Sequence, residues 1–133
     1  MSREPKMIDI LGETDVAYAS LDAKHFAEAI GFSKSDQCLI ATAVSELARN
    51  IFVYAKNGKV LLQRLEQVSR VGMEVIAEDS GPGIVDVEKA MEDNYSTVGT
   101  MGVGLPGTRR LMDEFEICSE LNRGTRVTIR KWL

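Results

Sequence analysis

Hydrophobic positions recur along the chain with two different periods, and the helical period dominates its first half. Residues 7–11 alternate between apolar and polar side chains and predict a short first strand. Residues 14–30 repeat apolar side chains every three or four positions, which predicts a helix. A second and longer helix, capped by Ser35, is predicted to about residue 56. Its apolar stripe is the clearest in the chain and consists of Leu39, Ile40, Ala43, Val44, Leu47, Ala48, Ile51, Phe52 and Ala55.

Strands dominate the second half of the chain. Residues 59–68 and 72–79 show the two-residue alternation of strands and are separated by a short turn, which predicts a hairpin. Residues 115–121 and 125–132 show the same alternation around a turn that contains Gly124. The chain is therefore predicted to close with a second hairpin.

A glycine-rich segment and a helix separate the two predicted hairpins. A short helix near residues 87–91 is followed by residues 92–103, whose polar and glycine-punctuated sequence indicates a mobile loop or lid. Residues 105–115 predict a helix, since Pro106 is tolerated in a first turn. Helices are thus grouped and do not alternate with every strand. This order predicts an α+β two-layer sandwich, with a mixed, mostly antiparallel sheet covered on one face by helices.

Length and composition indicate one globular domain over residues 1–133. The chain has 133 residues, of which 44% are hydrophobic and 27% charged, values far from those of disordered segments. No apolar run approaches the roughly 20 residues needed to span a bilayer, and the N-terminus leads into no signal-like stretch. We therefore expect a cytoplasmic protein without a membrane partner.

The charge balance argues against nucleic acid as a partner. Sixteen Lys and Arg residues stand against twenty Asp and Glu residues, a net charge of −4. Nucleic-acid binding normally needs a basic excess to neutralise phosphates. The one dense basic cluster is interpreted as a solvated strand edge and consists of Arg123, Arg126, Arg130 and Lys131.

Thiol and histidine chemistry have little support in the sequence. Cys38 and Cys118 lie far apart without a CxxC spacing, and in a cytoplasmic protein they are interpreted as buried thiols. His25 has no Cys, His or paired acid at ligand spacing. Neither a histidine-based metal site nor a Ser-His-Asp triad is therefore expected.

The second predicted helix carries the first candidate site residues. Glu46 and Asn50 are four residues apart and share one face, with Thr42 and Arg49 beside them. An amide oxygen is a suitable ligand for Mg²⁺, and a nearby carboxylate can orient or deprotonate a hydroxyl group. The alternative is a solvated helix face on which Glu46 pairs with Arg49 or Asn50. The spacing alone leaves both interpretations open.

The second candidate is the segment 79–83, Asp-Ser-Gly-Pro-Gly, at the end of a predicted strand. Asp79 is last in a series of inward-facing residues, where a carboxylate needs a hydrogen-bond donor. The exocyclic amino group of adenine is such a donor, and Gly81 and Gly83 would allow the backbone close to the base. An ordinary Asp/Gly turn is the alternative.

The third and fourth candidates are glycine segments further along the chain. Glycines between residues 99 and 107 precede a predicted helix, whose positive N-terminus could hold phosphates. The same glycines match GxGxxG, but the polar segment before them is no strand, so a dinucleotide fold is set aside. A glycine loop without a ligand remains an alternative. Thr125, after Gly124, could support Asp79 directly or through water, or could simply follow a hairpin turn.

In this order, the four features resemble the Bergerat-type ATP-binding fold of the GHKL superfamily, which includes gyrase, histidine kinases and the MutL repair proteins. Nearly from end to end, the chain is similar to the small bacterial serine/threonine kinases that act as anti-sigma factors or as switch proteins of the stressosome. The segments that carry this similarity are residues 45–51, 77–84, 91–93, 104–107 and 110–115.

The resemblance implies a role for each candidate residue. Asp79 would bind adenine with Thr125 in support, Asn50 would hold Mg²⁺, and Glu46 would accept or orient the proton of the attacking hydroxyl. Phosphoryl transfer asks the protein mainly for positioning and charge neutralisation, so this small set suffices. The remaining ATP-binding positions that the resemblance implies are Gly81, Gly83, Gly102, Val103, Gly104, Leu105, Arg49 and Arg109.

The resemblance also implies partners that the residues themselves do not reveal. The phosphorylated protein would be a STAS-domain antagonist held in a stressosome scaffold, and the released kinase would engage a PP2C-type phosphatase. Two other functions stay open: a nucleotide-gated module that sequesters a protein such as a sigma factor, and a stand-alone ATPase.

Overall fold

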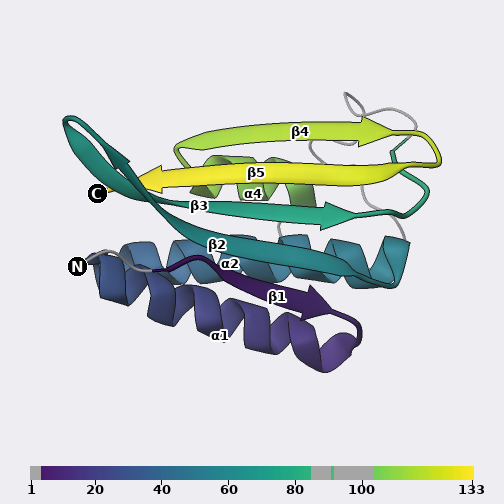
Figure 1. The fold of residues 1–133 in the computed structure, drawn as a ribbon, viewed down its shortest axis with the longest axis horizontal. Coiled ribbons are helices and arrows are strands. Elements are labelled where there is room, and N and C mark those ends of the chain that lie inside the picture. The colour runs from purple at the N-terminus through teal and green to yellow at the C-terminus, as the bar shows by residue number, and fades with distance from the viewer. Residues whose placement is uncertain (1–3, 85–90, 92–103) are drawn as a thin grey trace.

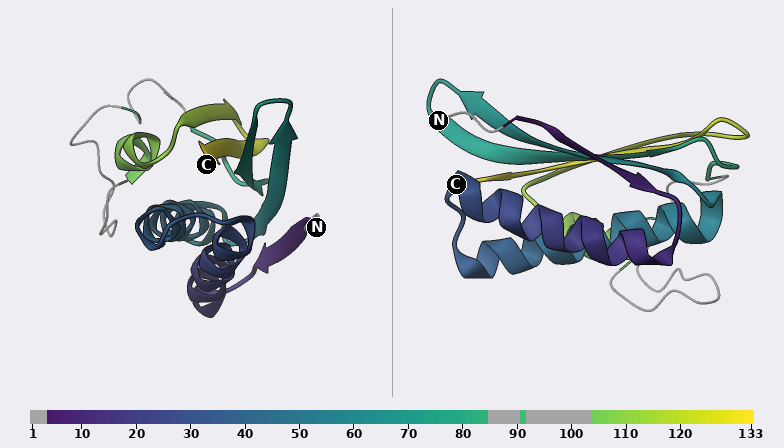
Figure 2. Two further views of the ribbon diagram at one scale, coloured as in Figure 1. Left: turned by 90° about the vertical axis from the view of Figure 1, so that its left-hand side faces the viewer. Right: turned by 60° about the horizontal axis from the view of Figure 1, so that its bottom comes forward.

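The protein folds as two layers, with one sheet and helices over one of its faces (Figures 1 and 2). The computed structural model describes residues 4–84, 91 and 104–133. Along these residues the elements are β1 Lys6–Ile10, α1 Glu13–Ile30, α2 Lys34–Asn50, the π-helix η1 Ile51–Ala55, β2 Gly58–Gln67, β3 Arg70–Asp79, α4 Gly104–Leu111, β4 Glu114–Glu120 and β5 Gly124–Trp132. The α+β sandwich expected from the sequence is confirmed.

The sheet has the strand order β1-β2-β3-β5-β4, and every neighbouring pair is antiparallel. The last strand, β5, therefore lies inside the sheet and not at its edge. The expectation that the basic residues of this strand are solvated is wrong for Arg130 and Lys131. Arg130 is half-buried and lies 2.6 Å from a carboxylate oxygen of Glu74, and Lys131 is buried and donates its Nζ to the Leu111 carbonyl at 3.0 Å. The partners of both residues, Glu74 and Leu111, are remote from them in the sequence, so the sequence pattern did not reveal these bonds.

The core lies between the sheet and the helices. Alternate residues of β3, namely Met73, Val75 and Ala77, face the helices and are buried, which is the two-residue period of a strand with one covered face. Phe26 of α1 and Leu47 of α2 are buried opposite them. Fully burying a side chain of this size stabilises the fold by about 1.5–3 kcal/mol.

The second helix begins earlier than expected and changes type near its end. Its cap is Ser33, whose Oγ accepts the backbone N–H of Asp36 at 3.1 Å, and not Ser35. After Asn50 the backbone continues as a π-helix, which ends at Lys56 in a positive-φ conformation. Judged only by length and hydropathy, residues 34–55 would qualify as a membrane span, a test that core helices also pass.

Two other sequence expectations need correction. The third helix ends at Leu111 and not at residue 115. Asp113 donates its backbone N–H to the Arg130 carbonyl, and its Oδ2 accepts the backbone N–H of Trp132 at 2.8 Å. These bonds to β5 end the helix and start β4. Cys38 and Cys118 are exposed, not buried. Apart from Met91, the segments predicted as a short helix and a lid lie outside the described residues.

Candidate functional site

The carboxylate of Asp79 is held in one orientation at the end of β3. Its Oδ1 accepts the backbone N–H of Gly81 at 2.9 Å and that of Thr125 at 3.3 Å. Within the described part of the chain, Oδ2 has no hydrogen bond. The side chain is half-buried on the helix-facing side, next to Ala77 in the inward series. One carboxylate oxygen is therefore fixed by the protein and the other is free to accept from a ligand.

The segment after Asp79 passes close to the π-helix. A Cβ on Gly81 would lie 2.6 Å from Cβ of Ala55, so the close approach of these two segments requires glycine there. The sequence interpretation assigned this glycine to contact with the base. The geometry shows a packing requirement that the sequence did not reveal, since Ala55 is remote in the chain and belongs to η1. Gly83 and Gly124, both at positive φ, are packed against backbone in the same way.

Glu46 and Asn50 lie one helical turn apart on α2, as their spacing predicted. Glu46 is only 6% exposed, and its Oε2 has no hydrogen-bond partner among the described residues. A buried oxygen in this state costs about 1–3 kcal/mol, and such groups are candidates for contact with a ligand or a transferable proton. The alternative, a solvated helix face on which Glu46 pairs with Arg49 or Asn50, is wrong for Glu46, because Glu46 is buried and makes neither contact.

Ile51, the residue that follows Asn50, lies close to the strand end that carries Asp79. Gly58 pairs with Asp79 between β2 and β3. A Cβ on Gly58 would lie 2.7 Å from Cγ2 of Ile51 and 3.1 Å from Cβ of Asp79. The half-buried side chain of Asn50 makes no hydrogen bond within residues 4–84, 91 and 104–133. The residue after Asn50 therefore packs close to the strand end that carries Asp79, and the amide oxygen of Asn50 is of a type that suits a cation.

The third helix, α4, packs beside α2 and begins toward the same end of the molecule as the end of β3 (Figure 1). Gly104 opens it with a φ of 65°, and the fully buried Thr108 closes its first turn by donating to the Gly104 carbonyl at 2.8 Å. Leu105 packs against the core. The first backbone N–H groups of a helix suit an anion such as phosphate. Gly102 and Val103, the other predicted residues of this cradle, lie outside the described residues.

The two arginines that were predicted to contact phosphate occupy different helices. Arg49 on α2 is half-buried and makes no ion pair within the described residues. Arg109 on α4 is exposed and, with Met91, Pro106 and Arg110, lines an open pocket of about 470 Å³. Nothing in the described structure places Arg109 beside Asp79 or Asn50.

One polar residue near Asp79, Ser119 on β4, was not predicted from the sequence. Its Oγ accepts the backbone N–H of Ile84 at 2.7 Å, lies 2.9 Å from Oγ1 of Thr125 and lies 3.3 Å from the Gly124 carbonyl. It therefore connects the segment after Asp79 to the start of β5. The signal that could have found it is weak: Ser119 is the third member of a helix-facing series after Phe115 and Ile117, where an apolar residue is expected.

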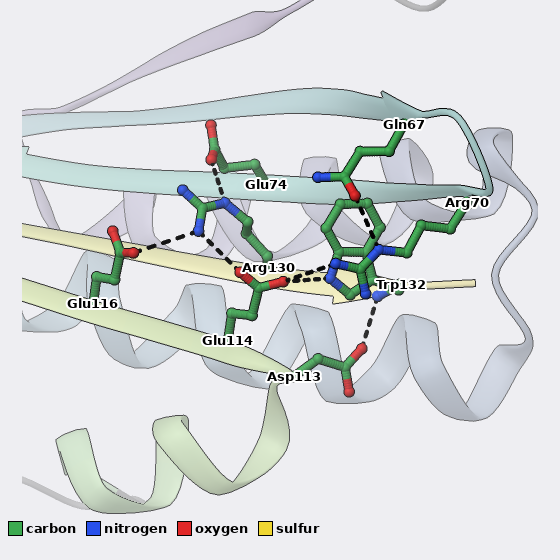
Figure 3. Close-up of polar contacts among 8 residues, drawn as sticks. All are labelled: Gln67, Arg70, Glu74, Asp113, Glu114, Glu116, Arg130 and Trp132. Atoms are coloured by element: carbon green, nitrogen blue, oxygen red, sulfur yellow. Dashed lines mark hydrogen bonds and ion pairs between the residues drawn. The ribbon is translucent and has the colours of Figure 1, made fainter.

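The open face of the sheet carries a second polar cluster, which is fully paired (Figure 3). Arg130 bridges Glu74 at 2.6 Å and Glu114 at 3.1 Å, and Glu114 also accepts the indole N–H of Trp132. Arg70 stacks on the Trp132 ring, 3.7 Å from its centroid. The Trp132 bond, followed by Arg130, lowers the pKa of Glu114, and Glu74 raises the pKa of Arg130. This cluster stabilises the sheet on the face opposite Asp79.

The two-layer fold with this strand order indicates a class of ATP-binding domain, and comparison with known sequences confirms that class. Residues 13–131 match the family described as the histidine kinase-like ATPase domain, so the chain belongs to that family of ATP-using domains.

Within the family, the chain belongs with the serine/threonine-protein kinases. It is 44% identical over 126 residues to the serine/threonine-protein kinase RsbT of Bacillus subtilis (strain 168), and the match covers 95% of each chain. It is 35% identical over 100 residues to the anti-sigma F factor of Caldanaerobacter subterraneus subsp. tengcongensis, covering 71% of this chain and 68% of that one.

Solved structures with lower identity show the same fold. The RsbU and RsbW domains of a Mycobacterium tuberculosis protein match with a TM-score of 0.66 and 19% identity, over 97% of this chain and 32% of that one. The catalytic domain of the histidine kinase ThkA matches with a TM-score of 0.55 and 14% identity, over 95% of each chain.

Proposed function

We propose that this kinase uses Mg-ATP to phosphorylate a serine or threonine of a STAS-domain antagonist within a stressosome-like switch, and then engages a PP2C-type phosphatase. The observation that carries the proposal is the carboxylate of Asp79, whose Oδ1 is fixed by two backbone N–H groups and whose Oδ2 has no hydrogen bond to any described residue. The similarity to RsbT supports the kinase activity, and the partners are those that the family resemblance implies. The reaction would take place in the cytoplasm.

Three elements share the binding of the nucleotide in this proposal: β3, α2 and α4. Asp79 Oδ2 accepts a hydrogen bond from the exocyclic amino group of adenine. The amide oxygen of Asn50 would hold Mg²⁺, and the N-terminus of α4 would receive phosphate oxygens, with Gly102 and Val103 as further predicted contacts. When bound, Mg²⁺ neutralises charge on the phosphates.

Glu46 is the residue that acts on the substrate hydroxyl in this proposal. Its buried Oε2 lacks a partner in the described structure, so it is available to accept or orient the proton of the attacking serine or threonine. Its low exposure keeps water from competing for that oxygen. Positioning and general-base assistance of this kind contribute about 10²–10⁴-fold in rate.

A nucleotide-gated binding module with little catalysis is the second candidate, because the anti-sigma F factor of Caldanaerobacter is also similar to this chain. Glu46→Gln distinguishes the two functions. We expect loss of phosphate transfer to the STAS-domain protein of the same organism, with ATP affinity retained. Unchanged transfer would remove the role of Glu46. Absence of transfer by the wild-type protein, despite ATP binding, would favour the binding module, and phosphate release without partner labelling would indicate an ATPase.

A further inference from the structure

The C-terminal end of α4, away from the turn proposed to receive phosphates, is joined to β5 by three hydrogen bonds. Lys131 donates its Nζ to the carbonyl of Leu111, the last residue of the helix, at 3.0 Å. Asp113 donates its backbone N–H to the Arg130 carbonyl at 3.0 Å, and its Oδ2 accepts the backbone N–H of Trp132 at 2.8 Å. These bonds place the end of α4 at a defined point along β5.

Lys131 occupies a position where the strand pattern predicts an apolar side chain. It follows Val127 and Ile129 in the helix-facing series of β5 and pairs in register with the fully buried Met73. Its side chain is buried, and its Nζ lies 4.0 Å from Oδ1 of Asp113. The last carbonyls of a helix carry partial negative charge and favour a cation. A methionine would fill the same space, so what lysine adds at this position is a directional bond to α4.

Packing holds the middle of α4. Gly107 and Thr108 are buried, the helix packs beside α2, and Leu105 contacts the core. The hydroxyl of Thr108 bonds back to its own helix, at the Gly104 carbonyl. Hydrophobic contacts are not directional, whereas a hydrogen bond depends on angle as well as distance. Packing therefore sets how closely α4 approaches its neighbours, and the bonds at its C-terminal end set its position along its own axis.

The helix is short enough for its two ends to move together. From Gly104 to Leu111 it rises about 10 Å, at about 1.5 Å per residue. A shift of the Leu111 carbonyl is therefore passed on to the N–H groups of the first turn. We infer that Lys131 and Asp113 are positioning residues, which fix the C-terminal end of α4 and so place its N-terminus for the phosphates of the nucleotide. The inference rests on the proposed function and adds two residues that act on the nucleotide only through α4.

The test compares a ligand that carries phosphates with one that does not. Affinities for ATP, by calorimetry, and for adenosine, by NMR titration, are measured with the wild-type protein and with Lys131→Met, which keeps an apolar side chain and removes the donor. We expect ATP to bind about tenfold more weakly to Lys131→Met, because misplacing a group by about 1 Å can cost up to about 10²-fold. Adenosine should bind as it does to the wild-type protein, since the contact proposed at Asp79 is not altered.

A second variant and a control separate positioning from simple loss of structure. Replacing a buried charged side chain by an apolar one of similar volume is often neutral or stabilising, so Lys131→Met should fold. Asp113→Ala removes the acceptor of the Trp132 N–H and should show the same selective loss of ATP affinity. It carries the test if Lys131→Met does not fold. Lys24→Met makes the same substitution at an exposed position of α1 and should bind both ligands normally.

Equal losses for ATP and adenosine, or an unchanged ATP affinity in the folded variants, would overturn the positioning role while the proposed function stands. Absence of ATP binding by the folded wild-type protein would overturn both.

Discussion

Thr125 follows Asp79 by 46 residues in the chain, yet its backbone N–H donates to Oδ1 of that carboxylate at 3.3 Å. The bond ties the end of β3 to the start of β5 and fixes which carboxylate oxygen remains available. The nucleotide site proposed for this kinase is thus built by strand pairing, and its binding residues are held before a ligand arrives. Such preorganisation reduces the cost of binding.

Substitution of Gly81 should damage both stability and nucleotide binding. In Gly81→Ala the new Cβ would lie 2.6 Å from Cβ and 2.9 Å from Cα of Ala55, and backbone atoms cannot move aside cheaply. Overpacking of this kind costs about 1–3 kcal/mol, which we expect as a lower free energy of unfolding in urea denaturation. Gly12→Ala is the matched control, because nothing lies within 4 Å of its Cβ position. An equally stable Gly81→Ala variant would contradict the packing described.

Removal of the Asn50 side chain should reduce the increase in ATP affinity that Mg²⁺ provides. We expect ATP to bind the wild-type protein more tightly with Mg²⁺ than with EDTA. In Asn50→Ala the ratio of these two affinities should be smaller by a factor of about ten or more. Affinities measured by calorimetry in both conditions give the difference. Asn57→Ala, an exposed asparagine after η1, should retain the full Mg²⁺ dependence. If Asn50→Ala retained it too, Asn50 would not be the metal ligand.

Acid should destabilise the sheet through Glu114. Its pKa in the folded protein is lowered from the ordinary value of 4.5, chiefly by the Trp132 indole and then by Arg130 (Figure 3). A carboxyl group whose pKa is lower in the folded than in the unfolded protein stabilises the fold at pH values above its unfolded-state pKa. This stabilisation is lost as the pH falls through the pKa of the folded state. We therefore expect the melting temperature to fall more steeply below pH 4.5 in the wild-type protein than in Glu114→Gln.

The control for this pH dependence is Glu120→Gln, which changes an exposed carboxylate on the same strand. It should reproduce the wild-type acid profile. Arg130 contributes no pH dependence in this range, because its raised pKa keeps it charged throughout. Identical acid profiles for the wild-type protein and Glu114→Gln would show that the Glu114 bonds do not persist in solution.

Sequence periodicity predicted the order of helices and strands, because each period reports which face of an element is buried. It did not predict the neighbours of a strand. The polar face of β5 was interpreted as an edge, since the carboxylate that pairs with Arg130 belongs to Glu74, 56 residues earlier. The change from α- to π-helix after Asn50 was also missed, because the apolar residues of η1 fit either geometry.

The candidate site was predicted where one residue carries its own chemical signal. Asp79 in an inward-facing series and the pair Glu46 and Asn50 on one helix face were identifiable for that reason. Ser119 was not, since its importance depends on contacts with Ile84 and Thr125 that only the folded chain brings together. The roles of these residues in binding and catalysis remain predictions.

Titration of Mg-ATP into the folded wild-type protein and into Asp79→Asn is the most direct test of the proposed site. The account predicts saturable heat of association for the wild-type protein and an affinity about 10- to 100-fold lower for the variant, the loss expected for a hydrogen bond to a charged acceptor. Glu78→Gln, next in the strand but exposed on the other face, should bind normally. No heat of association with the folded wild-type protein, or equal affinities for the wild-type protein and Asp79→Asn, would contradict it.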